Sequence, residues 1–584
     1  MSGTRAGFFA AAVVVLGAGM LASCERQPDS TPAAGPAQPD SALAADLVIR
    51  NARVYTQNPQ QPHATSVAVA DGVIVAVGDD TSTAEFVAGH TRLIDAGQGM
   101  LLPGLHDAHV HPLSSGAALL GCSLSDAGSE QEILDGLQDC AADGEQGWLV
   151  GLDFNLGLFP GGNPHKASLD ALFPQRPVFL AAADGHSAWV NSAALALAGI
   201  TPDTPNPPQG VIERDPATGE ATGTLRETAQ ALVSDLLPKA TPEDDIAALR
   251  AALHFMHSKG ITSFIDAAVG EQHWRAYRSL AAAGELQARV RTSLTHGTFS
   301  QHPGEEFAAV LARRGEYAGE RLNTDAVKLF VDGVLEGETA ALVTPYLGEH
   351  PHSGEINFDP EELKDIVTRF DAMGLQVHVH AIGDRGVRTA LDAFEAARER
   401  NGELDNRHHI AHLQLVHPDD FPRFARLNVS TTFQALWAYP DSYITEINLP
   451  AVGAERVNRM YPVHSLQQAG ARIVGGSDWS VSSVNPLDAI ETALRRQDPD
   501  SLVPGTLNAQ EAVTLDTMLA AYTRDAAWLM HQEKLVGSIE VGKRADLVLL
   551  NQDLYRIPVE DINSTTVQMT LFDGEVVYRA GETN

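Results

Sequence analysis

The feature that most constrains the fold of this chain is a repeated alternation of short apolar runs with helical segments. The apolar runs span residues 100–111, 261–266, 290–295, 326–331, 376–380, 408–413, 429–434 and 472–478. Helical patterns follow several of them, as at residues 360–373 and 386–400. Strands that alternate with helices form parallel sheets, and eight such units fit a closed barrel. We therefore predict an α/β fold with a (β/α)8 TIM barrel; an open doubly wound sheet is the alternative.

Both ends of the chain carry short runs of alternating apolar and polar residues. Residues 46–77 contain the turn signal Asp71-Gly72, and the C-terminal segment contains Asp573-Gly574. Because chain termini often lie close together, we expect the two segments to pair. The predicted domains are a small composite β-sandwich of residues 46–103 plus 536–584 and a barrel of residues 104–535.

Residues 112–259 are too long for one β/α repeat. They hold extra strand-like runs at residues 148–152 and 178–182. We interpret them as a large insertion after the first barrel strand, over the end of the barrel where sites usually form. Cys122 and Cys140 lie in this insertion. A disulfide and two unpaired thiols both fit the sequence, and neither cysteine has the spacing of a metal ligand.

The N-terminus has the pattern of an export signal. Arg5 precedes an apolar run at residues 6–22 that is rich in Ala and Gly, as the core of a signal peptide is. The run leads into a Leu-Ala-Ser-Cys sequence at residues 21–24, which resembles the bacterial lipobox. In a lipobox, cleavage leaves a lipid-modified cysteine at the new N-terminus. A plain signal peptide, or a membrane anchor that happens to end in Cys, is the alternative.

These patterns predict where the chain is located. We expect a signal peptide over residues 1–24, lipidation of Cys24 and a flexible tether over residues 25–45, which are rich in Pro, Ala, Ser and Asp. Glu25 replaces the Asp that often retains lipoproteins at the inner membrane. The prediction is an exported, lipid-anchored protein on the periplasmic face of a bacterial outer membrane.

Charge restricts the partners of the chain. The 584 residues include 40 basic and 75 acidic ones, for a net charge of −35. Such a surface repels phosphate backbones, so we expect no nucleic-acid partner. The expected partners are a small-molecule substrate and, through Cys24, a membrane. The sequence does not predict the oligomeric state or the identity of the substrate.

The strongest chemical signal is a set of ligand-type side chains at strand ends. His109 and His111 are two residues apart on one strand, so they share a face and can bind one metal. Other strand ends carry His378, His380, His408, His409, His412 and Asp478. Barrel sites form at the C-terminal ends of strands, and buried His and Asp without partners are costly. The pattern indicates a metal site rather than core packing.

Lys328 lies within the fourth apolar run, where an unpaired lysine is rare. One interpretation is a side chain that extends its amine to solvent. The other is a lysine carbamylated by carbon dioxide, which becomes a carboxylate able to bridge two metals.

The chain resembles the amidohydrolase superfamily, and within it the amidohydrolase-3 or YtcJ-like branch, whose known members include N-substituted formamide deformylases. The resemblance covers roughly residues 46–584. The matching motifs are residues 101–111, 177–180, 184–192, 222–225, 328–333, 378–384, 476–479 and 537–547.

The resemblance implies the following ligands. His109, His111 and Asp478 bind the more buried metal, and carbamylated Lys328 bridges to a second metal held by His380 and His412. His380 is preferred to His378 because it lies nearer the strand end, and His412 is preferred to His408 and His409 by its match to the motif. Two zinc ions are expected, with manganese or iron as alternatives.

Two departures from the family pattern weaken any inference of substrate from known members of the family. Ala411 replaces a usual Glu before the strand-six His, which removes a partner that would hold His412. Glu336 and Glu338 replace a Ser-Arg-containing run after the strand-four Asp-Gly. Two carboxylates there would change the charge preference for substrate if they face the mouth.

The resulting expectation is a metal-dependent hydrolase of carbon–nitrogen bonds in non-peptide amides, formamides or cyclic amides, acting through a metal-activated hydroxide. Asp478 would accept a proton and pass it to the leaving amine. Candidate substrate contacts are Asp184, His186, Trp189, Asn191, Arg226 and Asp332. The alternatives are a mononuclear deaminase-type enzyme of the same superfamily and a non-catalytic, metal-binding surface lipoprotein.

Overall fold

The structure is a computed structural model that describes residues 44–141, 147–297 and 299–582. The predicted signal peptide, Cys24 and nearly all of the predicted tether lie outside the described residues. Within those ranges, the helices are too short or too polar to cross a membrane.

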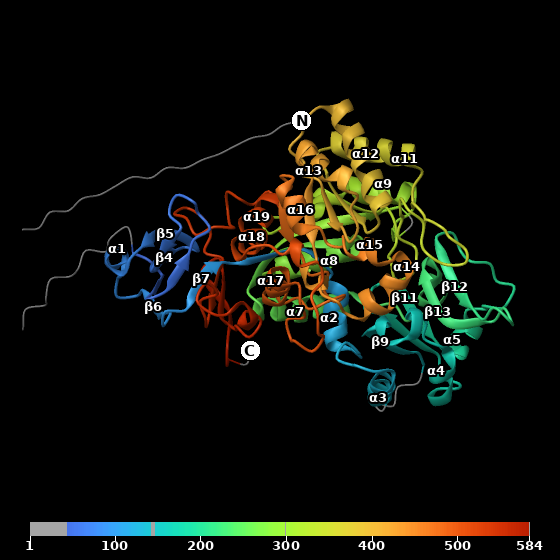
Figure 1. The fold of residues 1–584 in the computed structure, drawn as a ribbon. Helices are drawn as coiled ribbons and strands as arrows, with labels where there is room; N and C mark the ends of the chain where they lie inside the picture. Colours follow the sequence, from blue (N-terminus) through green and yellow to red (C-terminus); the bar gives the residue numbers. More distant parts are fainter. Residues whose placement is uncertain (1–43, 142–146, 298, 583–584) are drawn as a thin grey trace, which may run out of the picture. The chain divides into compact units, whose positions relative to one another are not determined.

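Eight parallel strands form one sheet at the centre of the fold, in the order β20-β19-β18-β17-β16-β15-β14-β8 (Figure 1). Their bounds are β8 (Leu105–Val110), β14 (Ile261–Val269), β15 (Arg289–His296), β16 (Leu322–Phe330), β17 (Gln376–Ala381), β18 (His409–His412), β19 (Ser430–Phe433) and β20 (Ile473–Gly475). Each overlaps one of the eight predicted runs, so the predicted barrel is confirmed. The first predicted run forms two strands instead of one. The strands are separated at Gly104, where a Cβ would meet the Thr262 side chain.

The barrel closes between its first and last strands at the carboxyl ends of the strands. The Asp478 amide donates to the His109 carbonyl at 2.7 Å, and the His111 amide donates to the Trp479 carbonyl at 3.0 Å. Gly476 permits this approach, because a Cβ there would lie 2.9 Å from the His109 backbone nitrogen. Closure therefore brings the first and last predicted ligand segments together.

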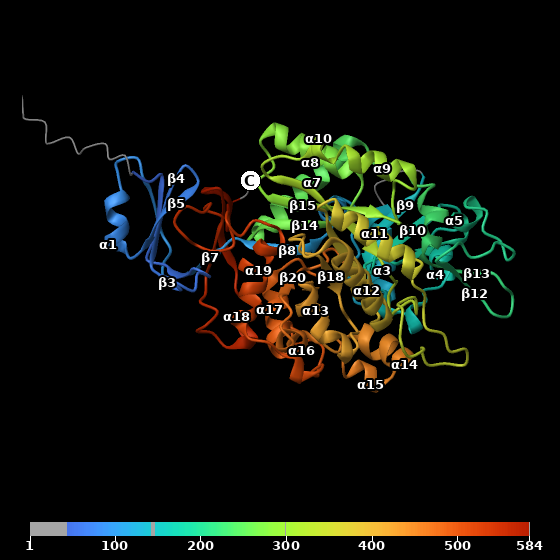
Figure 2. The ribbon, with the colours of Figure 1, turned by 90° about the horizontal axis from the view of Figure 1, so that it is seen from above.

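Helices follow the strands as the pattern predicted. α11 (Pro360–Ala372) and α12 (Asp384–Asn401) come after β16 and β17. Asp359 caps α11 by accepting hydrogen bonds from the amides of Glu361 and Glu362, and proline occupies the first helical position. In Figure 2 helices surround the barrel strands.

The two ends of the chain form two further sheets. One has the order β5-β4-β1-β6, and the other has the order β23-β22-β21-β7-β2-β3. The bounds are β1 (Leu47–Arg50), β2 (Arg53–Tyr55), β3 (His63–Ala64), β4 (Ser66–Ala70), β5 (Val73–Gly78), β6 (Arg92–Asp95), β7 (Met100–Pro103), β21 (Leu547–Leu550), β22 (Val567–Phe572) and β23 (Glu575–Arg579).

An apolar core joins these two sheets, as predicted for a composite sandwich. Leu101 of β7 is paired with Leu549 of β21, which couples the N-terminal segment to the C-terminal one. Both belong to a buried cluster that also contains Ile49, Val69 and Leu571. The predicted Asp-Gly turns occur before β5 and β23, with positive φ at all four turn residues.

The insertion forms a five-stranded sheet of its own, in the order β12-β13-β11-β10-β9. Its strands are β9 (Leu149–Phe154), β10 (Val178–Ala182), β11 (Ser187–Val190), β12 (Gly210–Arg214) and β13 (Ala221–Glu227). A disulfide joins Cys122 and Cys140, which settles the alternatives that the sequence left open. This sheet and the sandwich strands lie on opposite sides of the barrel (Figures 1 and 2).

Candidate metal centre

The predicted metal ligands all lie at the carboxyl ends of barrel strands. They are His109 on β8, His111 just after it, Lys328 on β16, His380 on β17, His412 on β18 and Asp478 after β20. These ends form the face where barrel enzymes bind their substrates. The arrangement follows from the strand positions, because each ligand is at or near the last residue of its strand.

Three of these residues form one compact buried group. One ligand atom each from His109, His412 and Asp478 lies within 4.8 Å of the other two. Asp478 Oδ1 is 3.4 Å from His109 Nε2 and 2.9 Å from His111 Nε2, and Oδ2 is 3.6 Å from His412 Nδ1. Asp478 Oδ1 nevertheless accepts no well-aligned hydrogen bond within the described chain. Imidazole nitrogens that face an unpaired buried carboxylate oxygen are the donor set of a divalent metal site.

Electrostatics keep this group in the protonation states that a metal requires. Burial, and then the Lys328 charge, lower the pKa of His109 to about 3. Burial also holds the pKa of His412 well below its usual value. Burial raises the pKa of Asp478, but His109 and His111 more than offset this effect and hold it well below the usual value. Neutral imidazoles beside a carboxylate are ready to bind a cation.

Two of the predicted ligands adopt backbone conformations that non-glycine residues rarely take. φ is +79° at His412 and +57° at Asp478. Each such conformation costs on the order of 1–3 kcal/mol and persists where the surroundings impose it, commonly at functional sites.

Lys328 lies fully inside the barrel, beside this group. Its Nζ is 3.5 Å from His109 Nε2, and no carboxylate of the described residues comes within 4.0 Å of it. Burial lowers the pKa of its amine to about 7. The amine therefore does not extend to solvent, and carbamylation stays a prediction.

The neighbouring histidines of strand β17 have different positions. His378 lies deeper, where its Nε2 forms a 2.8 Å hydrogen bond with His109 Nδ1 and its Nδ1 contacts Ser293. It thereby orients His109 so that Nε2 faces Asp478. His380 lies nearer the mouth, with its ring centroid 4.5 Å from that of His412 and its Nε2 donating to the Gly333 carbonyl at 3.1 Å. His380 adjoins the compact group without belonging to it.

His412 has partners that the sequence analysis missed. Its Nδ1 hydrogen-bonds Gln434 Oε1 at 2.9 Å, and Trp437 stacks on its ring at 5.6 Å between centroids. The expected loosening of His412 by Ala411 was therefore wrong, because a side chain from the next strand holds the ring. Gln434 ends the seventh predicted strand, so the rule applied to the other strand ends would have found it.

Asp332 ties two barrel loops together. The carboxylate accepts hydrogen bonds from the amides of Ile382 at 3.0 Å, Gly383 at 2.9 Å and Ala341 at 2.9 Å. Its Oδ1 is 3.8 Å from His380 Nε2. Asp332, predicted as a substrate contact, therefore uses its carboxylate to bind backbone amides of these loops.

Three predicted substrate contacts instead hold the insertion sheet together. Trp189 is fully buried in an apolar cluster. Asn191 caps helix α5 (Ser192–Leu197) and makes four hydrogen bonds to the backbone. Arg226 binds Glu213 and groups of its own module, among them Ser187. The polar groups of Asn191 and Arg226 bind groups of their own module, and residue type alone gave no indication of this.

The turn before β11 places His186 next to the metal centre. Asp184 Oδ1 accepts hydrogen bonds from the amides of His186 and Ser187 at 2.9 Å, which shapes the turn. The His186 ring centroid is 5.3 Å from that of His380. Burial lowers the His186 pKa, but the adjacent carboxylate of Glu227 more than offsets burial and raises it to about 9. Glu227 was not predicted from the sequence; it directly follows Arg226 on the opposite face of β13.

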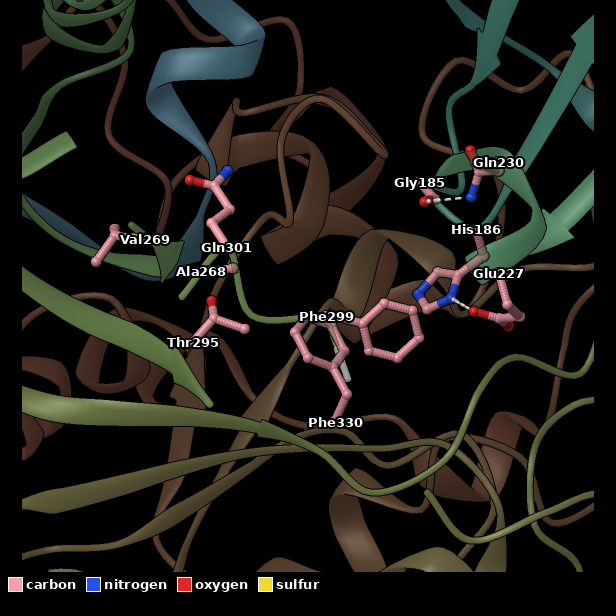
Figure 3. Close-up of a pocket in the computed structure, with 10 residues that line it drawn as sticks. All are labelled: Gly185, His186, Glu227, Gln230, Ala268, Val269, Thr295, Phe299, Gln301 and Phe330. Atoms are coloured by element: carbon pink, nitrogen blue, oxygen red, sulfur yellow. Dashed lines mark hydrogen bonds and ion pairs between the residues drawn. The ribbon is translucent and has the colours of Figure 1, made fainter. Parts of the chain in front are cut away.

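A cavity of about 190 Å³ adjoins this histidine (Figure 3). His186 and Glu227 line one side, and Phe299, Phe330 and Thr295 are among the barrel residues that line the other. The cavity therefore lies between the insertion and the barrel strand ends.

The two carboxylates that depart from the family pattern have separate roles. Glu336 is buried and accepts a hydrogen bond from Asn448 Nδ2 at 3.0 Å, while burial raises its pKa. Glu338 is exposed and pairs with His352 at 3.0 Å.

Comparison with known proteins places the chain in a family. The amidohydrolase family model Amidohydro_3 matches residues 92–578. Protein LONG AFTER FAR-RED 3 of Arabidopsis thaliana is 30% identical over 92% of this chain and 93% of its own length. N-substituted formamide deformylase of Arthrobacter pascens is 28% identical over 91% of this chain and 98% of its own length.

A solved structure agrees with this assignment. An uncharacterized metal-dependent hydrolase from Pyrococcus furiosus is 26% identical, with a TM-score of 0.65, over 87% of this chain and 99% of its own. Because the family model covers most of the chain and includes all of the strand-end ligands, the chain belongs to the amidohydrolase family.

Proposed function

We propose that this chain is a metal-dependent hydrolase of carbon–nitrogen bonds in non-peptide amides, formamides or cyclic amides. The observation that carries the proposal is the convergence of His109, His412 and Asp478, with Lys328 beside them, at the mouth of the barrel. A cavity of about 190 Å³ offers room for a small organic molecule, and two residues that line it, His186 and Phe330, have rings 5.3 Å from that of His380. The name of the Arthrobacter relative supports a formamide or related amide as substrate.

The proposed ligands are His109, His111, His380, His412, Asp478 and carbamylated Lys328. A bound divalent metal, zinc in the first instance, supplies a Lewis acid that polarises the amide carbonyl and lowers the pKa of water. Asp478 accepts the proton of the attacking water on its unpaired oxygen and delivers it to the leaving nitrogen. His378 keeps His109 in the orientation that this site requires.

The test combines metal content with product release. The mature chain is purified with bicarbonate and zinc, and its metal is measured by elemental analysis. Hydrolysis is followed on a panel of formamides, which release an amine, and of cyclic amides, which open to a product that keeps the new amine. We expect about two metals per chain, falling in Lys328→Ala, because the bridge between them is lost. Lys364→Ala, at a half-buried position on α11, is the control and keeps the wild-type metal content. A chain without metal or turnover would refute the proposal.

A mononuclear enzyme of the deaminase type is the second candidate. It is favoured by the compact group, since His109, His412 and Asp478 together suit one ion. In that case the same measurement gives about one metal, unchanged by Lys328→Ala. A second panel of amino-substituted rings then releases ammonia, whereas the formamides yield no amine.

We also propose export with a lipid anchor at Cys24. The disulfide between Cys122 and Cys140 supports an oxidising compartment. In a bacterial host, the wild-type chain is expected to incorporate labelled fatty acid and to fractionate with membranes, and Cys24→Ser to do neither. Equal labelling of both chains would contradict the anchor.

A further inference from the structure

His186 and Glu227 form a hydrogen-bonded pair at the wall of the cavity. His186 Nδ1 lies 2.8 Å from Glu227 Oε2, and both side chains are largely buried, with exposures of 14% and 4%. Figure 3 shows the imidazole with one nitrogen toward Glu227 and the other toward the space in front of Phe299 and Phe330. The pair therefore presents a fixed ring edge to whatever fills the cavity.

The cavity-facing nitrogen is available for a contact. His186 Nε2 has no hydrogen-bond partner among residues 44–141, 147–297 and 299–582. The ring is 5.3 Å from that of His380, which is itself 4.5 Å from that of His412. A molecule bound at the metal centre that extends into the cavity passes this nitrogen.

Glu227 is held in place from several directions. Its second carboxylate oxygen accepts a hydrogen bond from Thr339 Oγ1 at 2.7 Å. Gly333, whose carbonyl contacts His380 Nε2, packs so closely that a Cβ there would lie 2.5 Å from Glu227 Oε1. The Glu227 backbone has φ +51° and ψ −129°, a region that glycine normally occupies. Such strain is maintained at functional sites when the surroundings impose it.

A second histidine–carboxylate pair in the same chain shows what a purely structural role looks like. His408 Nε2 is 3.0 Å from Asp371 Oδ1, with exposures of 13% and 6% that match those of the first pair. Its other nitrogen, Nδ1, accepts a hydrogen bond from the Val377 amide at 3.0 Å. Both ring nitrogens of His408 are therefore used inside the protein, whereas only one nitrogen of His186 is.

We propose that His186 contacts the bound substrate through Nε2 and that Glu227 is the positioning residue that fixes its imidazole. The inference rests on the proposed amide hydrolase function and adds to it a substrate contact supplied by the insertion. The contact is a hydrogen bond between Nε2 and a polar atom of the amide substrate, on the side of the metal centre that faces the cavity. Thr339 holds Glu227 and, through it, the ring.

This arrangement explains why the insertion belongs to the catalytic unit. The metal ligands come from barrel strands, whereas His186 precedes β11 and Glu227 ends β13. A substrate that spans both modules is bound by the barrel at its reacting bond and by the insertion at a neighbouring polar atom. Orientation of this kind contributes to rate as well as to binding.

The experiment uses the zinc-loaded full chain and the amide from the panel that it hydrolyses best. The variants are His186→Asn, Glu227→Gln and Glu227→Ala, with His408→Asn as the matched control. For each we measure metal content, the midpoint of thermal unfolding, kcat and KM. We expect His186→Asn to lower kcat/KM roughly tenfold or more at unchanged metal content, as the loss of a hydrogen bond to substrate does.

Glu227 is tested by conservative replacement. Glu227→Gln keeps an acceptor for the imidazole N–H, so it should retain more kcat/KM than Glu227→Ala, which frees the ring. His408→Asn should lower the unfolding midpoint and leave kcat/KM within roughly twofold of wild type. If Glu227→Ala fails to fold, the order of the kcat/KM values of wild type, Glu227→Gln and His186→Asn still tests the proposed contact.

The outcomes separate the two proposals. If His186→Asn and Glu227→Gln keep the wild-type kcat and KM while the metal-bound wild type turns over, the substrate contact is refuted and the hydrolase function stands. If His186→Asn loses metal along with activity, the residue serves the metal centre and the contact is equally refuted. If the wild type neither binds metal nor hydrolyses any amide, the hydrolase function fails first, and the inference that rests on it fails with it.

Discussion

The barrel mouth and the insertion sheet both bury polar side chains, but they use them differently. In the insertion, Asn191 makes four hydrogen bonds to the backbone and Arg226 binds four groups of its own module. At the barrel mouth, ligand atoms of His109, His412 and Asp478 converge within 4.8 Å, and Asp478 Oδ1 has no aligned hydrogen bond among the described residues.

The difference separates a structural polar group from a ligand. Buried polar atoms are nearly always paired, so a group whose partners all lie in its own module has its role explained by folding. A carboxylate oxygen and imidazole nitrogens that point at one another without pairing are explained by a bound cation. The convergence of several ligand atoms on an oxygen without a hydrogen bond, rather than residue type, therefore distinguishes the candidates of this chain.

The largest effect is expected at Asp478. Asp478→Ala removes the proposed proton acceptor and should lower kcat by roughly 10²- to 10⁴-fold. Its metal-free form should still fold, at a somewhat lower unfolding temperature, because the substitution removes the 2.9 Å contact between Asp478 Oδ1 and His111 Nε2. The measurements are steady-state rates on an amide substrate and calorimetric unfolding with chelator present.

The control for this prediction is Asp215→Asn in the insertion. Asp215 accepts hydrogen bonds from the amides of Ala217 and Thr218 in a surface turn. It is not one of the proposed metal ligands or substrate contacts. It should leave kcat unchanged. If Asp478→Ala retained substantial turnover, the assignment of Asp478 as the proton acceptor would be refuted, and with it the distinction between the two regions.

The sequence predicted the barrel mouth well because its geometry is local. A ligand at the end of a strand stays at the end of that strand whatever the neighbouring loops do, so His109, Lys328 and Asp478 could be placed from the strand pattern alone. Closure of the sheet then brings distant strand ends together without further information. The same holds for the sandwich, whose two Asp-Gly turns fix the strand pairing around them.

The remaining site residues depend on contacts that no local pattern encodes. Glu227 meets His186 across 41 positions, and Gln434 meets His412 across 22. Within the insertion, strand alternation sets Arg226 and Glu227 on opposite faces, but which face meets the barrel depends on how the whole module packs. This is why the sequence led to Arg226 as a candidate contact but not to its neighbour Glu227.

A smaller effect, which tests the insertion side of the comparison, is expected at Asn191. Asn191→Ala leaves the amides of Val178 and Ala194 and two carbonyls without their partners, and it removes the cap of α5. The free energy of unfolding should fall by about 1–3 kcal/mol. Metal content, kcat and KM should stay at wild-type values, because the side chain is satisfied within its own sheet.

Asp359→Ala provides the matched comparison, since Asp359 caps α11 at an exposed position outside the insertion. Asp359→Ala should lower the free energy of unfolding by less than Asn191→Ala, about 0.5–2 kcal/mol, because water replaces the lost cap. An Asn191→Ala chain with a raised KM and an unchanged unfolding midpoint would restore Asn191 as a substrate contact. It would also show that a fully hydrogen-bonded side chain can still serve the site, so satisfaction would no longer separate structural groups from functional ones.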